Sequence, residues 1–360
     1  MNDFTIQKID FFRVQSPLSQ PIADATHTIS EIAFIVARLT LANGVTGDGY
    51  LLAFDFSPNA CAGALADIRP YVEGRPVYET GRLAAEWNAT TEYFGMTGLQ
   101  RWALGIVNLA MWDAWARTLG QPIWKLLGTH HTRIPVYGSG GWLSYSDDEL
   151  LAETTGYARR GFRAVKIKVG SPDVERDIER LRKVREAIGP QIQIMMDANQ
   201  GLDYPRALRL AREALSMKIG WFEEPLPNTA FNQYAQLRAV SGIPIAMGER
   251  EYDTVALREL IDRRAIDLWQ PDILRLGGVE GWRESAALAQ AHGIPVLPHY
   301  YKEYDVPLLC TIEHPYGVES FDWINPVLDH PLPIADGFAM PIDRPGWGFS
   351  FKDEYLTDAF

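Results

Sequence analysis

The 360-residue sequence predicts an α/β fold in which a parallel β-barrel follows an N-terminal α+β domain. Three observations lead to this prediction. From residue 134 onward, short runs of β-branched and aromatic residues alternate with charged helical stretches. The first 130 residues show a different pattern, with strands first and a helix after them. Polar residues also stand at the end of one predicted barrel strand after another, where parallel barrels place their ligand sites.

The N-terminal region combines three predicted strands with an amphipathic helix. The strands, which are rich in β-branched and aromatic residues, are residues 4–14, 31–41 and 45–54. Asn43-Gly44 is a tight-turn sequence that joins the second strand to the third. Residues 15–30 separate the first two strands, and a loop of this length in a compact domain is often a functional lid. Apolar residues spaced three and four apart predict a helix from Leu99 to about Gly120.

Eight further strands are predicted in the second part of the chain. They begin at Ile134, Ala164, Gln193, Trp221, Ile243, Asp267, Ile294 and Tyr316. Helix-like segments such as 174–189 and 204–220 lie between most of them. This alternation favours a parallel sheet closed into a barrel. A doubly wound open sheet is the alternative, although no glycine-rich phosphate-binding sequence follows the first strand.

The chain is therefore expected to have three parts. Residues 1–130 form the predicted capping domain, residues 131–321 the barrel, and residues 322–360 a segment that packs back on the cap. In this last segment Asp336-Gly337 is a second hairpin sequence, and the short strands do not continue the barrel pattern.

The composition restricts the partners and the compartment. The 34 Lys and Arg against 46 Asp and Glu give a net charge of −12, which argues against a nucleic-acid or acidic-membrane partner. Only two cysteines, Cys61 and Cys310, are present, so a disulfide framework is not expected. The N-terminus does not read as a signal peptide, and the apolar run 32–42 contains Arg38 and is too short to span a bilayer. We expect a cytoplasmic protein.

Polar residues stand at or just after the ends of the second to the eighth predicted strands. They are Lys166 and Lys168, Asp197, Glu223, Glu249, Asp272, His299 and Glu319. From 197 onward the intervals are 26, 26, 23, 27 and 20 residues. One strand–helix unit has about this length when roughly 250 residues form eight units. These side chains are expected to meet at the mouth of the barrel.

Asp197, Glu223 and Glu249 follow three successive strands and are expected to bind Mg²⁺, which prefers hard oxygen ligands. Each carboxylate could instead pair with an Arg or cap the next helix. Three in succession would repel one another strongly, and a divalent cation resolves this most simply. Glu224 is expected to point to the other face of its strand.

Two proton-transfer groups are expected to face the same site. Lys166 and Lys168 share one face of a strand, and the proximity of two ammonium groups is expected to lower a lysine pKa and make a general base. The alternative is a basic edge exposed to solvent. Asp272 is expected to hold the tautomer of His299, which could otherwise be a core histidine bonded to a carbonyl. Glu319 is expected either to donate a hydrogen bond to developing charge while protonated, or to be a cap or surface pair.

The sequence around these residues resembles the enolase superfamily, and within it the mandelate racemase subgroup. The motifs that carry the resemblance are VKIKVG, MMDANQ, WFEEP, MGER, QPDILRLGG, LPHYYKE and GVESFDW, and the match covers most of the chain. The resemblance implies a modified (β/α)7β barrel whose cap is formed by the N-terminal region and the C-terminal tail. It also implies a Mg²⁺ site at the three carboxylates. Lys168 would be one acid/base, Lys166 a contact of the substrate carboxylate, and the His299–Asp272 pair the other acid/base.

The resemblance also implies the chemistry, which is removal of the proton α to a carboxylate to give an enediolate held by the metal, Lys166 and Glu319. The expected reaction is then loss of a β-hydroxyl from an acid sugar, a hexarate or aldonate such as galactarate, which gives a 2-keto-3-deoxy acid. The alternatives are a racemase or epimerase, and a sugar-lactone cycloisomerase. A non-catalytic metal-binding or scaffold protein is a third interpretation. A homo-oligomer is expected because barrels of this kind often assemble.

The residues expected to contact the substrate are Asn199, Tyr300, His27, Thr28, Arg250 and Lys302. His27 and Thr28 lie in the predicted lid, where polar groups suit sugar hydroxyls, whereas an aryl acid would favour an apolar lid. Arg250 and Lys302 are expected to contact a distal carboxylate.

Overall fold

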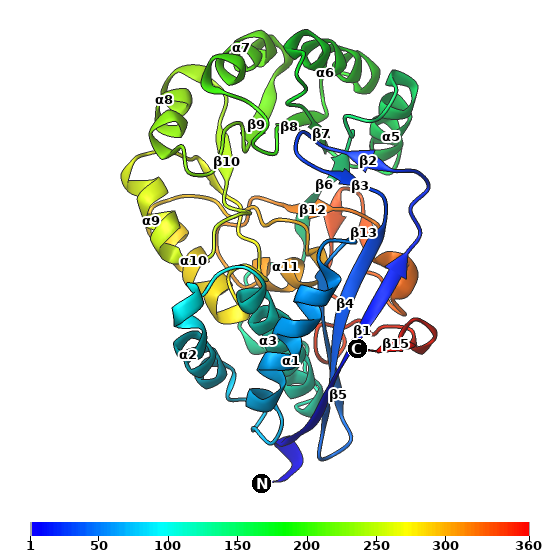
Figure 1. Ribbon diagram of the computed structural model, residues 1–360. Helices are drawn as coiled ribbons and strands as arrows, with labels where there is room; N and C mark the ends of the chain where they lie inside the picture. Colours follow the sequence, from blue (N-terminus) through cyan, green and yellow to red (C-terminus); the bar gives the residue numbers. More distant parts are fainter. Residues whose placement is uncertain (1, 360) are drawn as a thin grey trace.

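The computed structural model, which describes residues 2–359, places a barrel against an antiparallel sheet and its helices (Figure 1). The sheet has the strand order β15-β1-β4-β5. Its strands are β1 (Ile6–Ser16), β4 (Ile32–Leu41), β5 (Thr46–Leu52) and β15 (Asp358–Ala359). The predicted Asn43-Gly44 turn joins β4 to β5: the Asn43 side chain accepts a hydrogen bond from the Val45 amide at 3.0 Å, and Gly44 takes a positive φ of 82°.

The predicted lid between β1 and β4 contains a short hairpin, β2 (Ile22–Ala23) and β3 (Thr28–Ile29). Asp24 forms its turn, because its carboxylate accepts hydrogen bonds from the amides of Thr26 and His27, each at 2.7 Å. The Ala23 carbonyl accepts a hydrogen bond from the Leu143 amide at 2.8 Å, which attaches the hairpin to the barrel.

Four helices complete the cap. They are α1 (Pro58–Val72), α2 (Thr80–Thr91), α3 (Leu99–Thr118) and α4 (Ile123–Leu126). Helix α3 contacts strand β5 so closely that a Cβ at Gly49 would lie 2.3 Å from the Ile106 carbonyl oxygen. The predicted helix from Leu99 is therefore confirmed, and it covers one face of the sheet.

The barrel strands are parallel neighbours in chain order. They are β6 (Ile134–Gly140), β7 (Ala164–Lys168), β8 (Gln193–Asp197), β9 (Ile219–Glu223), β10 (Ile245–Met247), β11 (Leu268–Trp269) and β12 (Val318–Ser320). The barrel closes because β12 pairs with β6. At the seventh position the predicted strand from Ile294 is only a single bridging residue, Val296, between Trp269 and Pro315. Pro295 and Pro298 flank the bridge and carry no N–H to continue a ladder.

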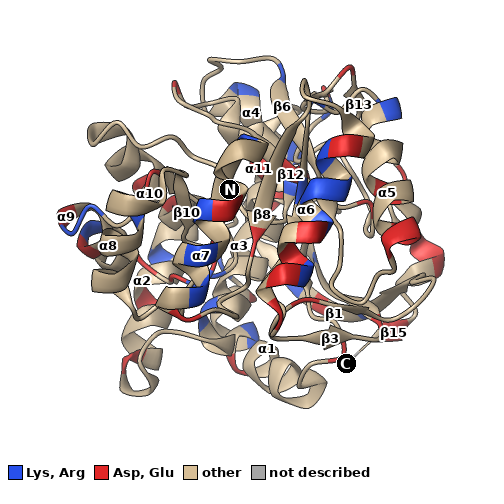
Figure 2. Cartoon of the chain, turned by 90° about the horizontal axis from the view of Figure 1, so that it is seen from above, with Lys and Arg blue, Asp and Glu red and all other residues tan. Residues whose placement is uncertain are grey.

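Helices surround the barrel, as the alternating pattern predicted. They are α5 (Asp147–Arg159), α6 (Val174–Ile188), α7 (Tyr204–Ala214), α8 (Phe231–Ser241), α9 (Thr254–Asp262), α10 (Val279–Ala291) and α11 (Lys302–Leu309). Ser146 and Glu149 form a capping box at the start of α5. Figure 2, in which the ribbon is coloured by residue type, shows that α6 carries both basic and acidic residues.

The C-terminal tail contacts both parts of the molecule. Strands β13 (Ile334–Ala335) and β14 (Phe338–Ala339) form the predicted hairpin at Asp336-Gly337, and β14 pairs with barrel strand β6. Strand β15 pairs with β1 of the cap. The boundaries proposed at residues 130 and 321 remain a prediction.

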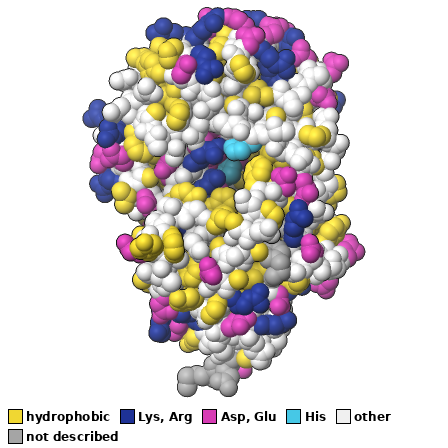
Figure 3. Space-filling model, viewed as in Figure 1, with side chains coloured by type: hydrophobic (Ala, Val, Ile, Leu, Met, Phe, Trp, Pro, Cys, Tyr) yellow, Lys and Arg dark blue, Asp and Glu magenta, His cyan; other side chains and the backbone are white. Residues whose placement is uncertain are grey.

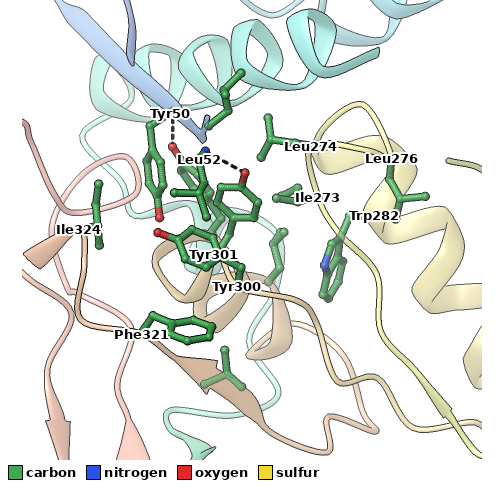
Figure 4. Close-up of a cluster of buried hydrophobic side chains, with 14 of the residues drawn as sticks. Tyr50, Leu52, Ile273, Leu274, Leu276, Trp282, Tyr300, Tyr301, Phe321 and Ile324 are labelled. Atoms are coloured by element: carbon green, nitrogen blue, oxygen red, sulfur yellow. Dashed lines mark hydrogen bonds between the residues drawn. The ribbon is translucent and has the colours of Figure 1, made fainter. Parts of the chain in front are cut away.

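A cluster of buried side chains joins the cap to the barrel (Figure 4). The Tyr301 hydroxyl accepts a hydrogen bond from the Leu52 amide at 3.1 Å, and the Tyr304 hydroxyl accepts one from the Tyr50 amide at 2.7 Å. Strand β5 is thereby held against the start of α11, next to the barrel mouth.

The predicted fold class is confirmed, and the open-sheet alternative is wrong because β12 returns to β6. Both Cys61 and Cys310 are free and buried, as expected from their number and spacing. Within residues 2–359 no helix has the length and apolarity needed to cross a bilayer.

Candidate active site

A cavity of about 370 Å³ lies between the barrel mouth and the cap. Its volume is in the range of small-molecule sites. The walls come from the lid hairpin, the segment after β5 and the start of α3 on one side, and from the loops after the barrel strands on the other.

Parallel register brings the predicted strand-end residues together. Lys168 on β7 is the register partner of Asp197 on β8, and Asp197 is the partner of Glu223 on β9. Side chains of register partners point to the same face, so these three project into the barrel mouth together. The predicted convergence of the first strand ends is therefore present in the fold.

The two lysine ammonium groups lie among the carboxylates. Lys166 Nζ is 2.6 Å from Glu223 Oε1, 2.7 Å from Glu319 Oε1 and 3.6 Å from Asp197 Oδ2. Lys168 Nζ is 2.5 Å from Asp197 Oδ2. In the described part of the chain, no three His, Cys, Asp or Glu side chains already surround a common point as metal ligands do.

The carboxylates nevertheless have the chemistry of a cation site. Burial and the repulsion of Asp197 raise the pKa of Glu223 to about 7, although Lys166 opposes this shift. Burial would also raise the pKa of Asp197, but Lys168 and Lys166 lower it below its usual value. The Asn199 side-chain oxygen is buried without a hydrogen-bond partner. Three carboxylates and an unpartnered amide oxygen form a donor set that fits Mg²⁺.

The expectation of a lowered lysine pKa is wrong for this arrangement. Burial lowers the pKa of Lys166, but Glu223 and Glu319 outweigh burial and raise it well above 10.5. For Lys168, the Asp197 carboxylate likewise outweighs burial and the repulsion of Lys166. Neighbouring negative charges, rather than the second ammonium group, dominate both sites.

His299 and Asp272 form the predicted pair. His299 Nδ1 is 2.9 Å from Asp272 Oδ2, and the other Asp272 oxygen accepts hydrogen bonds from the Leu274 and Arg275 amides. Burial lowers the pKa of His299, but Glu249 and Asp272 raise it above 6.5. His299 Nε2 is 3.7 Å from Glu249 Oε2, so the ring lies beside the three carboxylates Asp197, Glu223 and Glu249, which we call the carboxylate arc.

Glu319 accepts hydrogen bonds in this structure. Its Oε1 contacts Lys166, and its Oε2 accepts a hydrogen bond from the Tyr300 amide at 3.0 Å. Burial would raise its pKa, but Lys166 and His299 lower it below 4.5. The expectation of a protonated, donating Glu319 is therefore not met, because two donors favour its ionised form.

The expected substrate contacts divide into two groups. Asn199, Tyr300, His27 and Arg250 line the cavity. Thr28 is exposed and lies outside it.

Lys302 is also outside the cavity, with its side chain only 1% exposed. Its ammonium group donates to the Phe321 carbonyl and lies 3.0 Å from Glu303. The expectation that Lys302 contacts a distal carboxylate is wrong, because the first turn of α11 directs it into the core. Arg250 is at the cavity, but its Nε donates to Glu224 at 3.0 Å.

Two charged residues of the wall were missed by the sequence reasoning. Asp24 in the lid turn is hydrogen-bonded to the backbone N–H and the ring of His27. The D-x-x-H spacing in the lid sequence could have indicated that these two side chains pair. Burial raises the pKa of Asp24, but His27 and the nearby Lys168 bring it below 3.8. Arg275 also lines the cavity, and its guanidinium Nη1 lies 3.7 Å from Asp272 Oδ2. Its position three residues after Asp272 in the sequence was the clue that it would lie at the site.

An aromatic wall was also missed. Trp142 follows β6, while Phe321 and Trp323 follow β12. The Phe321 and Trp323 rings are stacked at 4.4 Å, and the Trp142 and Trp323 rings at 5.8 Å. Barrel closure, which makes the first and last strands neighbours, was the clue that these distant aromatic residues would meet.

Two family profiles together cover most of the chain. "Mandelate racemase / muconate lactonizing enzyme, N-terminal domain" matches residues 7–128, and "Enolase C-terminal domain-like" matches residues 149–355.

Three relatives of known activity are similar along almost the whole chain. L-talarate/galactarate dehydratase of Salmonella typhimurium is 30% identical over 345 residues, covering 94% of this chain and 87% of that protein. 3,6-anhydro-alpha-L-galactonate cycloisomerase of Streptomyces coelicolor is 28% identical and covers 97% of each chain. Arabinonate dehydratase of Saccharolobus solfataricus is 29% identical, covering 89% of this chain and 88% of that protein.

Solved structures share the fold closely. A racemase from Streptomyces coelicolor with bound magnesium superposes with a TM-score of 0.94 at 27% identity, covering 99% of this chain and 100% of that one. L-talarate dehydratase from Polaromonas sp. JS666, complexed with Mg and L-glucarate, gives 0.90 at 28% identity, covering 99% and 98%.

Proposed function

The chain belongs to the mandelate racemase and muconate lactonizing enzyme family of the enolase superfamily, and on this premise we propose that it is a Mg²⁺-dependent acid-sugar dehydratase. It would remove the proton α to the carboxylate of a hexarate or aldonate such as galactarate, and then water, to give a 2-keto-3-deoxy acid. The observation that carries the proposal is that Lys168 and His299 line one cavity beside the carboxylate arc, with Asp272 holding the His299 ring. The dehydratase activity of two relatives supports it.

Asp197, Glu223 and Glu249 are the residues proposed to hold Mg²⁺. When bound, the ion would supply a Lewis acid that stabilises negative charge on the substrate carboxylate, and it would neutralise the three ligands. Asn199 lies two residues beyond Asp197. Its backbone N–H donates a hydrogen bond to Asp197 Oδ1 at 2.9 Å, which fixes the orientation of that carboxylate.

Lys168 is proposed as the base that takes the α-proton. Its Nζ lies 5.3 Å from the centre of the Trp142 ring, and both side chains line the cavity. Lys166, held by Glu223 and Glu319 at 2.6 and 2.7 Å, would present its positive charge to the carboxylate end of the substrate as the enediolate forms.

His299 is proposed as the acid that delivers a proton to the departing β-hydroxyl. Its Nδ1 is bonded to Asp272, so Nε2 is the atom left to exchange protons with a ligand. His299 follows Val296, which occupies the seventh position of the barrel. Around the closed barrel this position is followed by β12, β6 and then β7, so it lies three steps away from the strand that carries Lys168. Base and acid would therefore act on different faces of the bound substrate.

A screen of hexarates and aldonates with purified protein and Mg²⁺ tests this proposal, with the 2-keto-3-deoxy product as the readout. We expect product with the native chain and with Lys183→Ala, in which a charge on the outer face of α6 is removed. We expect a loss of at least about 10³-fold with Lys168→Ala. Racemisation of a 2-hydroxy acid, with no acid sugar dehydrated, would contradict the proposal.

An epimerase or a sugar-lactone cycloisomerase is the second candidate. The same two proton-transfer groups could return a proton to the opposite face, and a cycloisomerase stands among the relatives. Deuterium incorporated from D₂O without loss of water would identify an epimerase. Turnover of a lactone, but not of the free acid, would identify a cycloisomerase.

A further inference from the structure

The cavity has two unlike halves. The large apolar side chains of its cap side are Ile29, Leu52, Phe54, Phe56, Leu99 and Trp102. The ionisable groups among the described cap residues that line it are Asp24, His27 and the Cys61 thiol, and Asp24 and His27 are bonded to each other. Figure 3 shows this hollow near the centre of the face, with Lys, Arg and His side chains beside it and hydrophobic side chains below.

Every cationic Lys or Arg side chain among the described residues of the wall comes from the barrel. These side chains are Lys166, Lys168, Arg250 and Arg275. The two lysines are paired with the carboxylate arc. Arg250 donates to the buried Glu224, and Arg275 contacts the Glu249 carbonyl. The four positive charges are therefore all engaged by groups of the barrel, although the Arg275 guanidinium also lies 5.3 Å from the centre of the Trp102 ring of the cap.

The aromatic wall connects the barrel side of the cavity to the cap. Trp142 lies beside Lys168, Trp323 stacks on Trp142, and Phe54 of the cap meets Trp323 edge to face at 6.1 Å. A molecule that extends from Lys168 toward the cap must lie along these rings. Aromatic faces carry partial negative charge and bind C–H groups or apolar substituents.

We infer that the substrate is a 2-hydroxy monocarboxylate whose end remote from the carboxylate is uncharged, as in an aldonate or deoxyaldonate, and that dicarboxylates are discriminated against. The inference rests on the proposed function, which places the reacting carboxylate on the barrel side. A second carboxylate would lose water against apolar side chains and would face Asp24. A methyl or hydroxymethyl group would instead pack on the rings.

Three acids of identical configuration at C2 to C5 test the inference, because they differ only in a methyl, hydroxymethyl or carboxylate group at C6. Their kcat/KM values for keto-acid formation are compared with Mg²⁺ present, in each configuration that reacts. We expect the methyl and hydroxymethyl acids to exceed the dicarboxylate by at least about 100-fold. A dicarboxylate that reacts as well as its monocarboxylate partners would overturn the inference.

A variant tests the cause of the discrimination. Phe56 is 44% exposed at the cavity, so Phe56→Arg can place a cation there with its stem along the wall. We expect the monocarboxylate preference to fall at least about tenfold. Phe94→Arg is the matched control, because Phe94 is 74% exposed and lies outside the cavity. An unchanged preference in Phe56→Arg would count against the inference.

The three acids that differ at C6 also distinguish a failure of the substrate inference from a failure of the proposed function. Deuterium exchange at Cα is measured with each acid in D₂O. If both the deuterium exchange at Cα and the dehydration are faster with the dicarboxylate than with the two monocarboxylates, the substrate inference is wrong and the proposed function still holds. The absence of exchange with every acid would overturn the proposed function and the inference with it.

Discussion

Lys168 Nζ lies 2.5 Å from Asp197 Oδ2, so the proposed base and a proposed magnesium ligand are paired with each other. Both side chains are buried. A buried carboxylate needs a counter-charge, and here the ammonium group supplies it. Mg²⁺ at the carboxylate arc would take over this role, so metal binding and the freedom of Lys168 are expected to be coupled.

We predict that Lys168→Ala binds Mg²⁺ more tightly than the native chain. The substitution removes the ammonium group that competes for Asp197, and we expect the Kd for Mg²⁺ to fall about tenfold. Isothermal titration calorimetry with Mg²⁺ alone measures this without any substrate. Lys183→Ala, which removes a surface partner of Asp147, is expected to leave the Kd unchanged. A weaker or equal affinity in Lys168→Ala would show that the ion does not displace the ammonium group.

His299→Asn should separate proton removal from loss of water. If Lys168 takes the α-proton and His299 supplies the proton to the leaving hydroxyl, the variant keeps deuterium exchange at Cα and loses keto-acid formation by about 10²–10⁴-fold. Mass spectrometry of recovered substrate measures the exchange. Asp272→Asn is expected to show the same pattern more weakly, since it disturbs the orientation of the ring. Loss of exchange in His299→Asn would instead make His299 the base.

The sequence predicted the strand-end residues well because parallel register leaves little freedom. Once β7, β8 and β9 are parallel neighbours, Lys168, Asp197 and Glu223 must lie side by side. The His299–Asp272 pair was predictable for the same reason. The seventh strand was not, because two prolines reduce it to the single bridge at Val296.

Properties that depend on three-dimensional surroundings could not be predicted. The spacing of Lys166 and Lys168 indicates mutual repulsion, but the carboxylates that reverse the pKa shift come from other strands. The burial of Lys302 depends on the direction of the first turn of α11. The aromatic wall requires Trp142 and Trp323 to meet across 180 intervening positions, which only barrel closure brings about.

Gly49→Ala should destabilise the cap. A Cβ at this position would lie 2.3 Å from the Ile106 carbonyl oxygen, so strand β5 and helix α3 would have to separate. We expect a loss of about 1–3 kcal/mol in the free energy of unfolding, measured by urea denaturation. Gly63→Ala is the matched control, because it lies in α1 with nothing within 4 Å of the added Cβ. It should stabilise by about 0.5–1 kcal/mol. Equal midpoints for the two variants would contradict the close packing of β5 on α3.

The Cys61 thiol should react slowly and with a steep pH dependence. Cys61 lines the cavity but is buried, and burial raises the pKa of its thiol above 9.0. The thiolate is the reactive form, so the rate with methyl methanethiosulfonate should rise about tenfold per pH unit up to and beyond pH 9. Burial raises the pKa of the other thiol, Cys310, to about 12, so Cys61→Ser should be almost unreactive until it unfolds. A bound substrate would fill the cavity and should slow the reaction at Cys61. A rate that levels off below pH 9, or that the substrate does not affect, would mean that the Cys61 thiol is not buried at the cavity.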